Sequence, residues 1–468
     1  MKASYITNDD TICALATAAG SAAIALIRMS GEDSLKIISR IFHPANKNFK
    51  EFKPFRINFG KIQDGKTLVD EVICSYFKAP HSYSGEDIIE ISCHGSEFIQ
   101  EKIIQLLISC GARLAKPGEF TLRAFLNGKL DLSQAEAVAD LISSNSDASH
   151  NLALKQMRGA YSEKIKDLRK QLLDFASLIE LELDFSEEDV EFADREKLIQ
   201  LLNILDSEIS ILIKSFEQGN VLKKGIPVAI AGKPNVGKST LLNAILNDEK
   251  AIVSDIPGTT RDAIEDSIII DGLAFRFIDT AGLRDSDDII ENLGIDRAYQ
   301  NVQKAKIILF VFDLSIDSCE QVLKDVDKLK EKLESNNNGF DPEVILIANK
   351  TDKLIETPKE FKKLVDYDCI FISAKRKENI SLITDRLLKL VKQKPSESII
   401  VSNTRHFEAL SKALESIKSI ISGFSEGLPT DLISIDIRRA LDQLGEITGE
   451  ITNDEILHNI FRNFCIGK

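Results

Sequence analysis

Hydrophobic and polar positions follow two different periods along this chain, and the period changes three times. Residues 1–119 alternate short strand-like runs, such as EVICSYF and DIIEIS, with helical stretches. Residues 120–218 keep helical spacing, residues 219–394 alternate strands and helices again, and residues 395–468 return to helical spacing. The pattern predicts an α/β domain, a helical part, a second α/β domain and a second helical part.

The two helical parts are expected to form a single domain. Neither part is followed by a sheet of its own, so the economical arrangement is one all-α domain into which residues 219–394 are inserted. In the insert, strands such as IILFVFD and EVILIAN alternate with helices, which predicts a doubly wound sheet. The fold class is therefore multidomain, with two α/β domains and an all-α domain.

Composition is that of a globular, intracellular protein. The 468 residues are 43% hydrophobic and 28% charged, which excludes a disordered chain and allows about three domains. The seven cysteines include no C-x-x-C pair, which favours buried thiols in a reducing cytosol. The apolar run Ile12–Ile27 follows acidic rather than basic residues, so it predicts two short strands instead of a signal peptide. A cytoplasmic protein without a membrane segment is expected.

Residues 232–239 read GKPNVGKS and carry the clearest chemical signal. They stand between an apolar strand-like run, Pro227–Ala231, and a helical segment, Thr240–Asn247, which is the order that a phosphate loop requires. The glycines let successive N–H groups point at phosphate oxygens, Lys238 reaches the β- and γ-phosphates, and Ser239 offers its hydroxyl to Mg²⁺. The motif predicts a nucleoside triphosphate site.

Four further motifs, DIPGTTRD, DTAG, NKTD and SAK, follow in the order found in GTPases, and the set resembles the signatures of translation-factor-related GTPases. In that family a switch threonine and the DTAG aspartate, here Thr260 and Asp279, complete the Mg²⁺ shell. The NKTD aspartate, here Asp352, pairs with the N1–H and 2-amino groups of guanine, which adenine cannot offer. The expected GTP-binding residues are Asn235, Val236, Gly237, Lys238, Ser239, Thr240, Ser254, Asp255, Ile256, Pro257, Gly258, Thr259, Thr260, Asp279, Thr280, Ala281, Gly282, Asn349, Lys350, Asp352, Ser373, Ala374 and Lys375.

The residue after DTAG departs from Ras-like enzymes, which place a water-orienting glutamine there. This chain has Leu283, which cannot form that hydrogen bond, so hydrolysis must be organised otherwise. The runs IENLGIDRA, SYSGEDIIEISCHG and KPGEFTLRAFLNGKLDLSQAEAVADLI, with a terminal CIGK, extend the comparison over nearly the whole chain. Together they resemble the MnmE (TrmE) family of tRNA-modifying GTPases.

The resemblance implies a potassium-assisted reaction. In that family the glutamate matching Glu291 orients the attacking water, and a K⁺ ion does the work of an arginine finger. The K⁺ ligands carried over are Asn235, Ser254, Ile256 and Thr259. A cation there would neutralise charge that builds on the phosphates in the transition state. The alternative for Glu291 is a solvated acid in a loop rich in aspartate; the motif match favours catalysis.

The resemblance also implies a folate site in the amino-terminal domain, which in that family forms a homodimer. The donor is 5,10-methylenetetrahydrofolate, with 5-formyl-tetrahydrofolate as a stable analogue, and the matching residues are Arg28, Glu90, Lys129 and Lys468. Without the family, Arg28 and Glu90 could be an ordinary ion pair at strand ends. Cys465 could be a nucleophile or a small buried hydrophobic residue, and no neighbouring base is visible in the sequence.

The implied reaction adds an aminomethyl or carboxymethylaminomethyl group to C5 of the wobble uridine of certain tRNAs. The partner would be an MnmG-like flavoprotein that carries FAD and forms a heterotetramer with this chain. The net charge is −14, and residues 129–218, with 10 basic and 19 acidic residues, contribute −9. No segment has the basic stripe of an autonomous nucleic-acid binder, so the RNA would be shared with a second protein. The alternative is a generic ribosome-assembly or regulatory GTPase without RNA-modifying chemistry.

Overall fold

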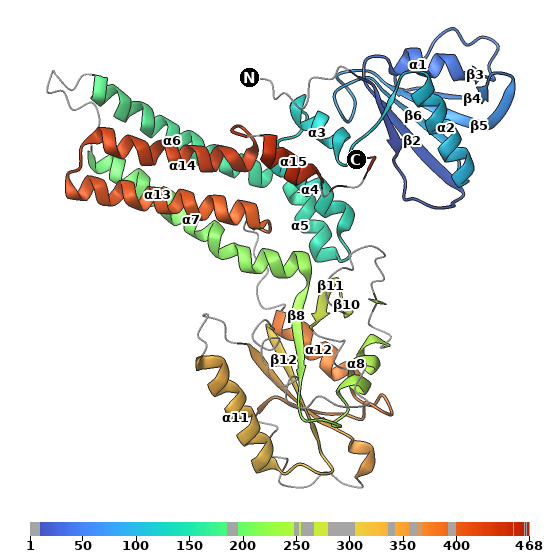
Figure 1. Ribbon diagram of the computed structural model, residues 1–468. Helices are drawn as coiled ribbons and strands as arrows, with labels where there is room; N and C mark the ends of the chain where they lie inside the picture. Colours follow the sequence, from blue (N-terminus) through green and yellow to red (C-terminus); the bar gives the residue numbers. More distant parts are fainter. Residues whose placement is uncertain are drawn as a thin grey trace. The chain divides into compact units, whose positions relative to one another are not determined.

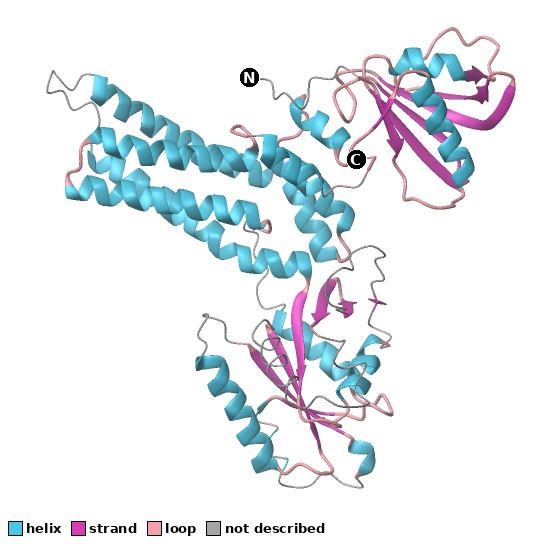
Figure 2. Cartoon of the chain, viewed as in Figure 1, coloured by secondary structure: helices cyan, strands magenta, loops and turns pink. Residues whose placement is uncertain are grey.

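The structure is a computed structural model that describes most of the chain. It describes residues 10–184, 195–247, 252–253, 266–278, 305–335, 342–354, 361, 364, 367–391, 399–452, 454–462, 464 and 466–467. The chain divides into two compact units. The first contains Met1–Ala139, Lys155–Ile209 and Glu408–Lys468, and the second contains Asp140–Leu154 and Ser210–Phe407. Figure 1 labels most of their elements, and Figure 2 shows that each unit includes both helices and a sheet.

The first unit contains a seven-stranded sheet in the order β3-β4-β5-β6-β2-β1-β7. Its strands are β1 (Ile12–Leu15), β2 (Ile24–Ser30), β3 (Phe42–Pro44), β4 (Ile57–Asp64), β5 (Thr67–Phe77), β6 (Ile88–His94) and β7 (Arg113–Leu114). Neighbours are antiparallel except β1 and β7, which pair in parallel. The sequence pattern predicted β1, β2, β5 and β6, whereas β3, β4 and β7 are additional.

Helices cover one face of this sheet. α1 (Ser34–Ile41) and α2 (Glu97–Ser109) bury Ile38 and Leu107 against Ile27 and Ile91 of the sheet. On the other face, α3 (Glu119–Leu126) packs Phe120 against β1. Farther along that face, β4 and β5 carry exposed apolar side chains. Ile57 is 73% exposed and Phe59 53%, while Ile73, the cross-strand neighbour of Phe59, is 42% exposed.

Helices that precede residues 219–394 in the sequence and helices that follow them pack together in the first unit. They are α4 (Leu132–Ser143), α6 (Ala160–Asp184), α13 (Thr404–Glu426), α14 (Thr430–Thr448) and α15 (Asp454–Arg462). α14 lies along α6 (Figure 1), and the rings of Phe175 and Phe424 meet edge to face at 6.1 Å. Segments that are distant in sequence therefore pack against one another in this unit.

Two of the three predicted domain boundaries fall inside helices, and the third, at residues 394 and 395, lies outside the described residues. α3 spans the boundary at residues 119 and 120, and α7 (Arg195–Lys224) continues through the boundary at residues 218 and 219. Of α5 (Asp147–Met157), residues 147–154 belong to the second unit, as does the end of α7. The boundaries stay predictions, because a continuous helix can belong to two packing units and helical spacing alone does not mark the change.

The second unit contains a seven-stranded sheet in the order β14-β13-β12-β8-β11-β10-β9. The strands are β8 (Ile226–Ala231), β9 (Ile252–Val253), β10 (Asp266–Ile270), β11 (Leu273–Phe277), β12 (Ile307–Asp313), β13 (Glu343–Asn349) and β14 (Cys369–Phe371). β14, β13, β12, β8 and β11 are parallel, and β10 is antiparallel to both neighbours. Every residue of the central strand β12 is buried, as expected for a strand covered on both faces.

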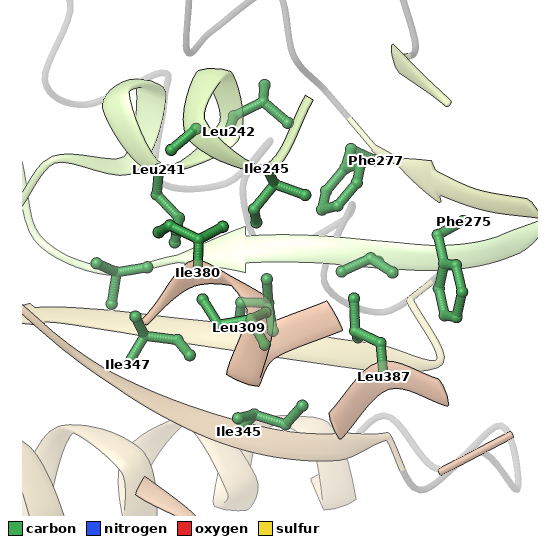
Figure 3. Close-up of a cluster of buried hydrophobic side chains, with 14 of the residues drawn as sticks. Leu241, Leu242, Ile245, Phe275, Phe277, Leu309, Ile345, Ile347, Ile380 and Leu387 are labelled. Atoms are coloured by element: carbon green, nitrogen blue, oxygen red, sulfur yellow. The ribbon is translucent and has the colours of Figure 1, made fainter. Parts of the chain in front are cut away.

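Helices lie on both faces of this sheet, which confirms the doubly wound α/β prediction. On one face α8 (Lys238–Leu246) and α12 (Ile380–Val391) bury Leu241, Ile245 and Leu387 against Leu309 and Ile347 (Figure 3). On the other face α11 (Cys319–Ser335) buries an apolar stripe against the sheet. A short 3₁₀ helix, η2 (Thr351–Lys353), follows β13. Among the described residues, no helix is long and apolar enough to span a membrane.

Candidate functional site

The phosphate-loop motif lies between β8 and α8, at the carboxyl end of a central parallel strand. This is where open α/β sheets bind their ligands. The predicted helix begins two residues earlier than expected, so that Lys238 and Ser239 form its first turn. Their N–H groups belong to the unpaired donors at a helix N-terminus, which favour a phosphate group.

The two glycines of the loop are required by close approach of other main-chain and side-chain atoms. Gly232 has a φ of +145°, and a Cβ atom there would overlap the carbonyl oxygen of Val311. Gly237 has a φ of +98°, and a Cβ atom would lie 2.5 Å from the amide nitrogen of Asn349. Both positions therefore need the conformational freedom and the small size of glycine.

The side chain of Lys238 is hydrogen-bonded to the main chain of its own loop. Its Nζ donates to the carbonyl oxygens of Gly232 at 2.9 Å and Lys233 at 2.8 Å. Burial lowers the pKa of Lys238, because an ammonium group loses hydration there. A phosphate group would compensate for this lost hydration by supplying negative charge.

The motifs predicted to bind the base contact the phosphate loop through Asn349 and Lys350. Asn349 donates from Nδ2 to the carbonyl oxygen of Val236 at 2.8 Å and accepts from the N–H of Ala374 at 3.0 Å. Lys350 donates from Nζ to the carbonyl oxygen of Asn235 at 2.6 Å. One asparagine and one lysine thus join the phosphate loop to NKTD and SAK, three segments that are distant in sequence.

The carboxylate of Asp352 is held in place as a hydrogen-bond acceptor. Its Oδ1 accepts a 2.7 Å hydrogen bond from the hydroxyl of Ser373, which lowers the pKa of Asp352. Ser373 Oγ in turn accepts from the N–H of Arg376 at 3.2 Å. An ionised, oriented carboxylate is what the paired N1–H and 2-amino donors of guanine require.

Three acidic residues beside this site were not identified from the sequence. Asp313 accepts from Lys350 at 2.6 Å, while Asp317 and Asp325 accept from Lys233 at 2.8 and 3.2 Å. Asp313 ends β12 at the carboxyl edge of the sheet. That position, next to the phosphate-loop strand, is the sequence signal that could have found it.

Several predicted site residues lie outside the described residues. They are Ser254, Asp255, Ile256, Pro257, Gly258, Thr259, Thr260, Asp279, Thr280, Ala281, Gly282, Glu291, Cys465 and Lys468.

In the first unit, the predicted folate residues Arg28 and Glu90 are paired. They face each other across β2 and β6, and Arg28 donates from Nε and Nη2 to Glu90 Oε1 at 2.9 and 2.8 Å. The guanidinium carbon of Arg28 lies 5.2 Å from the ring centre of Tyr83 and 5.7 Å from that of Phe120. A guanidinium and a carboxylate beside two aromatic rings suit a flat ligand with both donors and acceptors.

Lys129 and the end of the chain reach the same part of the unit. Lys129 donates to the carbonyl oxygen of Pro80, in the loop that also carries Tyr83. Gly467 lies directly against Leu15 in β1, the strand beside the one that carries Arg28. No sequence signal marked Tyr83 and Phe120, since their place beside Arg28 depends on how the loop and α3 pack.

Comparison with known proteins identifies the parts of the chain. Residues 132–465 match the family described as "MnmE helical domain", and residues 11–129 match "GTP-binding protein TrmE N-terminus". A relative from Flavobacterium psychrophilum, "tRNA modification GTPase MnmE", is 51% identical over 98% of this chain and 99% of its own length. A relative of the same description from Bacteroides thetaiotaomicron is 50% identical over 98% of this chain and 100% of its own length.

One solved structure that matches part of the chain is much less similar. The G domain of the T. maritima FeoB iron transporter is 24% identical and covers 36% of this chain and 99% of that one. Its TM-score of 0.26 is too low to support a conclusion about this chain.

Proposed function

Since the chain belongs to the MnmE family of tRNA modification GTPases, we propose that its GTP hydrolysis is potassium-dependent and serves a folate-dependent change at the wobble uridine. The product is a tRNA carrying an aminomethyl or carboxymethylaminomethyl group on C5 of that base. The observation that carries the GTP site is the contact of Asn349 and Lys350 with the phosphate loop, with Asp352 two residues farther along the same motif. Guanine would be read by Asp352, and the phosphates would lie over the N-terminus of α8.

The Mg²⁺ ion of the reaction would be held by Ser239 in the first turn of α8, with Thr260 and Asp279 of the following motifs. The position of Ser239 supports its part of this assignment, because a hydroxyl at that point of a phosphate loop is a common Mg²⁺ ligand.

A K⁺ site at Asn235 is supported by the shape of the loop. Asn235 has a φ of +62°, and its main-chain oxygen is engaged by Lys350, while its side chain is exposed. The side-chain oxygen is therefore a suitable ligand at the edge of the phosphate site, with Ser254, Ile256 and Thr259 as the other proposed ligands. A bound K⁺ would supply positive charge where the transition state gains negative charge. Glu291 is proposed to orient the attacking water, since Leu283 cannot.

The folate site is proposed around the Arg28–Glu90 pair, with Lys129 and Lys468 nearby. Glu90 would accept from the ring N–H and amino groups of a pterin, and Arg28 would donate to its carbonyl oxygen. The approach of Gly467 to β1 supports a contribution from Lys468. The bound folate would supply the one-carbon unit.

A homodimer through the amino-terminal sheet is proposed from the exposed apolar side chains on β4 and β5. Ile57, Phe59 and Ile73 form a contiguous patch on one sheet face, and such patches mark interaction surfaces. Within such a dimer, the two GTPase parts would meet at a high effective concentration, which would help to organise the switch residues in the transition state.

The partner is proposed to be an MnmG-like flavoprotein, with FAD handling the electron transfer in a heterotetramer. The acidic helical region supports a shared RNA site, because it lacks the positive charge to hold tRNA alone. The test is mass spectrometry of wobble nucleosides from cells that lack this protein. Loss of the C5-modified uridines is expected, whereas an unchanged nucleoside profile would favour a ribosome-assembly or regulatory GTPase.

A further inference from the structure

Two lysines of the nucleotide site are held by carboxylates that end or follow β12. Lys350 donates at 2.6 Å both to Asp313 Oδ2 and to the carbonyl oxygen of Asn235. Lys233, two residues before Asn235, donates to Asp317 Oδ1 at 2.8 Å. The phosphate loop is thus anchored at two nearby points to the carboxyl end of β12 and the segment after it.

Asp313 is itself firmly placed. The residue is 3% exposed, and its Oδ1 accepts from the N–H and hydroxyl of Ser315 at 3.0 and 2.6 Å. Its own N–H donates to Asp317 Oδ2 at 3.0 Å, which joins the two anchors. Burial alone would raise the pKa of Asp313, but the hydrogen bonds from Lys350 and Ser315 outweigh it, and the net pKa is lowered. Asp313 is therefore a fixed, charged acceptor.

The anchored loop needs such support, because Asn235 has a φ of +62°. Residues other than glycine adopt this left-handed conformation at a cost, which asparagine tolerates better than most. A conformation of this kind persists where the surrounding structure holds it. The contact that holds the carbonyl oxygen of Asn235 comes from Lys350, and Lys350 is directed by Asp313.

We propose that Asp313 is a positioning residue for nucleotide binding: through Lys350 it holds the Asn235 turn of the phosphate loop in its binding shape. The same link fixes the distance between the phosphate loop and the base-reading NKTD segment. Asp313 itself touches no nucleotide in this assignment. The inference rests on the nucleotide site proposed above, and it adds a residue that acts on this site through Lys350.

The alternative is that the Asp313–Lys350 pair serves only the stability of the fold. The two roles differ in what they change. A merely structural pair would lower the melting temperature without altering the affinity of the folded protein. A positioning pair weakens nucleotide binding in protein that is still folded, and it raises KM for GTP more than it lowers kcat, since the link acts in both the ground and the transition state.

The experiment measures binding of a fluorescent GDP to the full chain for wild type, Asp313→Asn, Lys350→Met and the double variant. Asp313→Asn is expected to raise Kd about tenfold, the usual scale for one lost charge-assisted hydrogen bond. The double variant should bind GDP as tightly as the weaker-binding of the two single variants, because both substitutions break the same link. Melting temperatures without nucleotide are measured in parallel.

The matched control is Asp368→Asn, which breaks a 2.7 Å ion pair with Arg386 at the start of β14, away from the carboxyl edge of the sheet. Its Kd should stay within twofold of wild type. Ser315→Ala is a milder second variant that keeps the ion pair but removes a hydrogen bond to Asp313, and it should weaken GDP binding about two- to threefold, roughly half the effect on a logarithmic scale.

Three results would overturn the role of Asp313. The first is wild-type affinity for GDP in both Asp313→Asn and Ser315→Ala. The second is a loss of affinity in the double variant that equals the sum of the two single losses. The third is a loss of affinity in Asp368→Asn as large as that in Asp313→Asn. If Asp313→Asn does not fold, Ser315→Ala decides the question alone. Absence of GDP binding by the wild-type chain would overturn the nucleotide site itself and this inference with it.

Discussion

The main chain of Val401 lies so close to Gly219 that a Cβ atom at position 219 would overlap the carbonyl oxygen of Val401. Gly219 is in α7, which leads into β8, and Val401 belongs to the segment that leads from the second sheet back to α13. The hydroxyl oxygen of Ser215 accepts from the N–H of Val401 at 3.0 Å, and the rings of Phe216 and Phe407 stack at 4.5 Å. The chain therefore enters and leaves the GTPase part side by side.

Gly219→Ala should destabilise the protein, although alanine normally stabilises a helix relative to glycine. The new methyl group meets main-chain atoms that cannot move aside, and overpacking of this kind costs about 2 kcal/mol. Thermal unfolding of the full chain measures the effect. Gly423→Ala in α13 is the control, since a Cβ atom there meets only side chains at 3.3 Å or more, so it should change the melting temperature little.

Asn235→Ala should reduce the dependence of GTP turnover on K⁺, because Asn235 is proposed to donate its side-chain oxygen to the ion. Wild type should hydrolyse GTP about tenfold faster in KCl than in NaCl, an effect of the size expected for one well-placed charge. Asn235→Gly removes the side-chain ligand without straining the backbone, since glycine tolerates a φ of +62°. Both variants should lose the difference between the salts; a variant that keeps it would remove Asn235 from the ion's shell.

Glu291→Ala should lose about 100-fold in kcat while GTP affinity is retained, because a residue that orients water acts in the transition state. Single-turnover hydrolysis and equilibrium binding, measured on the same sample, test the two halves of this expectation. Asp287→Ala is the control for a general loss of negative charge in this acidic part of the sequence and should turn over GTP normally. Equal turnover by Glu291→Ala and wild type would refute the assignment.

Arg28→Met should weaken binding of 5-formyl-tetrahydrofolate at least about tenfold, since it removes a charged donor from the proposed pterin site. Deletion of residues 465–468 should also weaken binding, because the chain end lies against β1 through Gly467. Calorimetry on the full chain measures both. Arg40→Met, on the exposed surface of α1, is the control, and its affinity should match wild type. Undiminished affinity in the truncated protein would exclude Lys468 from the site.

The protein should become less stable in acid, because the carboxylates of a cluster with two arginines then lose their charge. Arg113 donates to Asp10 at 2.6 Å and to Glu119 at 2.7 Å, and Arg123 also contacts both carboxylates. Burial opposes ionisation of Asp10 and Glu119, but the arginines outweigh it and lower both pKa values. Because the folded pKa values are depressed, the stabilisation is present above the unfolded values and is lost as the pH falls through the folded ones.

Glu119→Gln should therefore lower stability by about 2 kcal/mol at pH 7 and make thermal unfolding less dependent on pH below about 4.5. Calorimetry between about pH 7 and pH 3 provides the comparison with wild type. The control is Glu71→Gln, which removes an ion pair with Lys61 that is almost half exposed and contributes little. A steeper acid dependence in Glu119→Gln than in wild type would contradict the expected sign.

The sequence by itself determined the fold class and predicted which residues form the nucleotide site. The phosphate loop is local: eight consecutive residues supply its glycines, lysine and serine. A strand and a helix, β8 and α8, flank it as the pattern predicts, although α8 begins two residues earlier than expected. The period of apolar residues likewise reports buried faces directly, so strands such as β12 and helices such as α6 were found from spacing. Family motifs extended this to the whole chain, which the 51% identical relative confirms.

Only the tertiary structure decided which distant residues meet. Asp313 and Lys350 are 37 residues apart and come together because β12 and β13 are adjacent parallel strands that end at one edge. Gly219 meets Val401, and Gly467 meets Leu15, because packing of separate helices and strands brings their main chains into contact. Local periodicity records which side of an element is buried. It does not record what lies against that side, since strand order and helix packing depend on contacts over the whole chain.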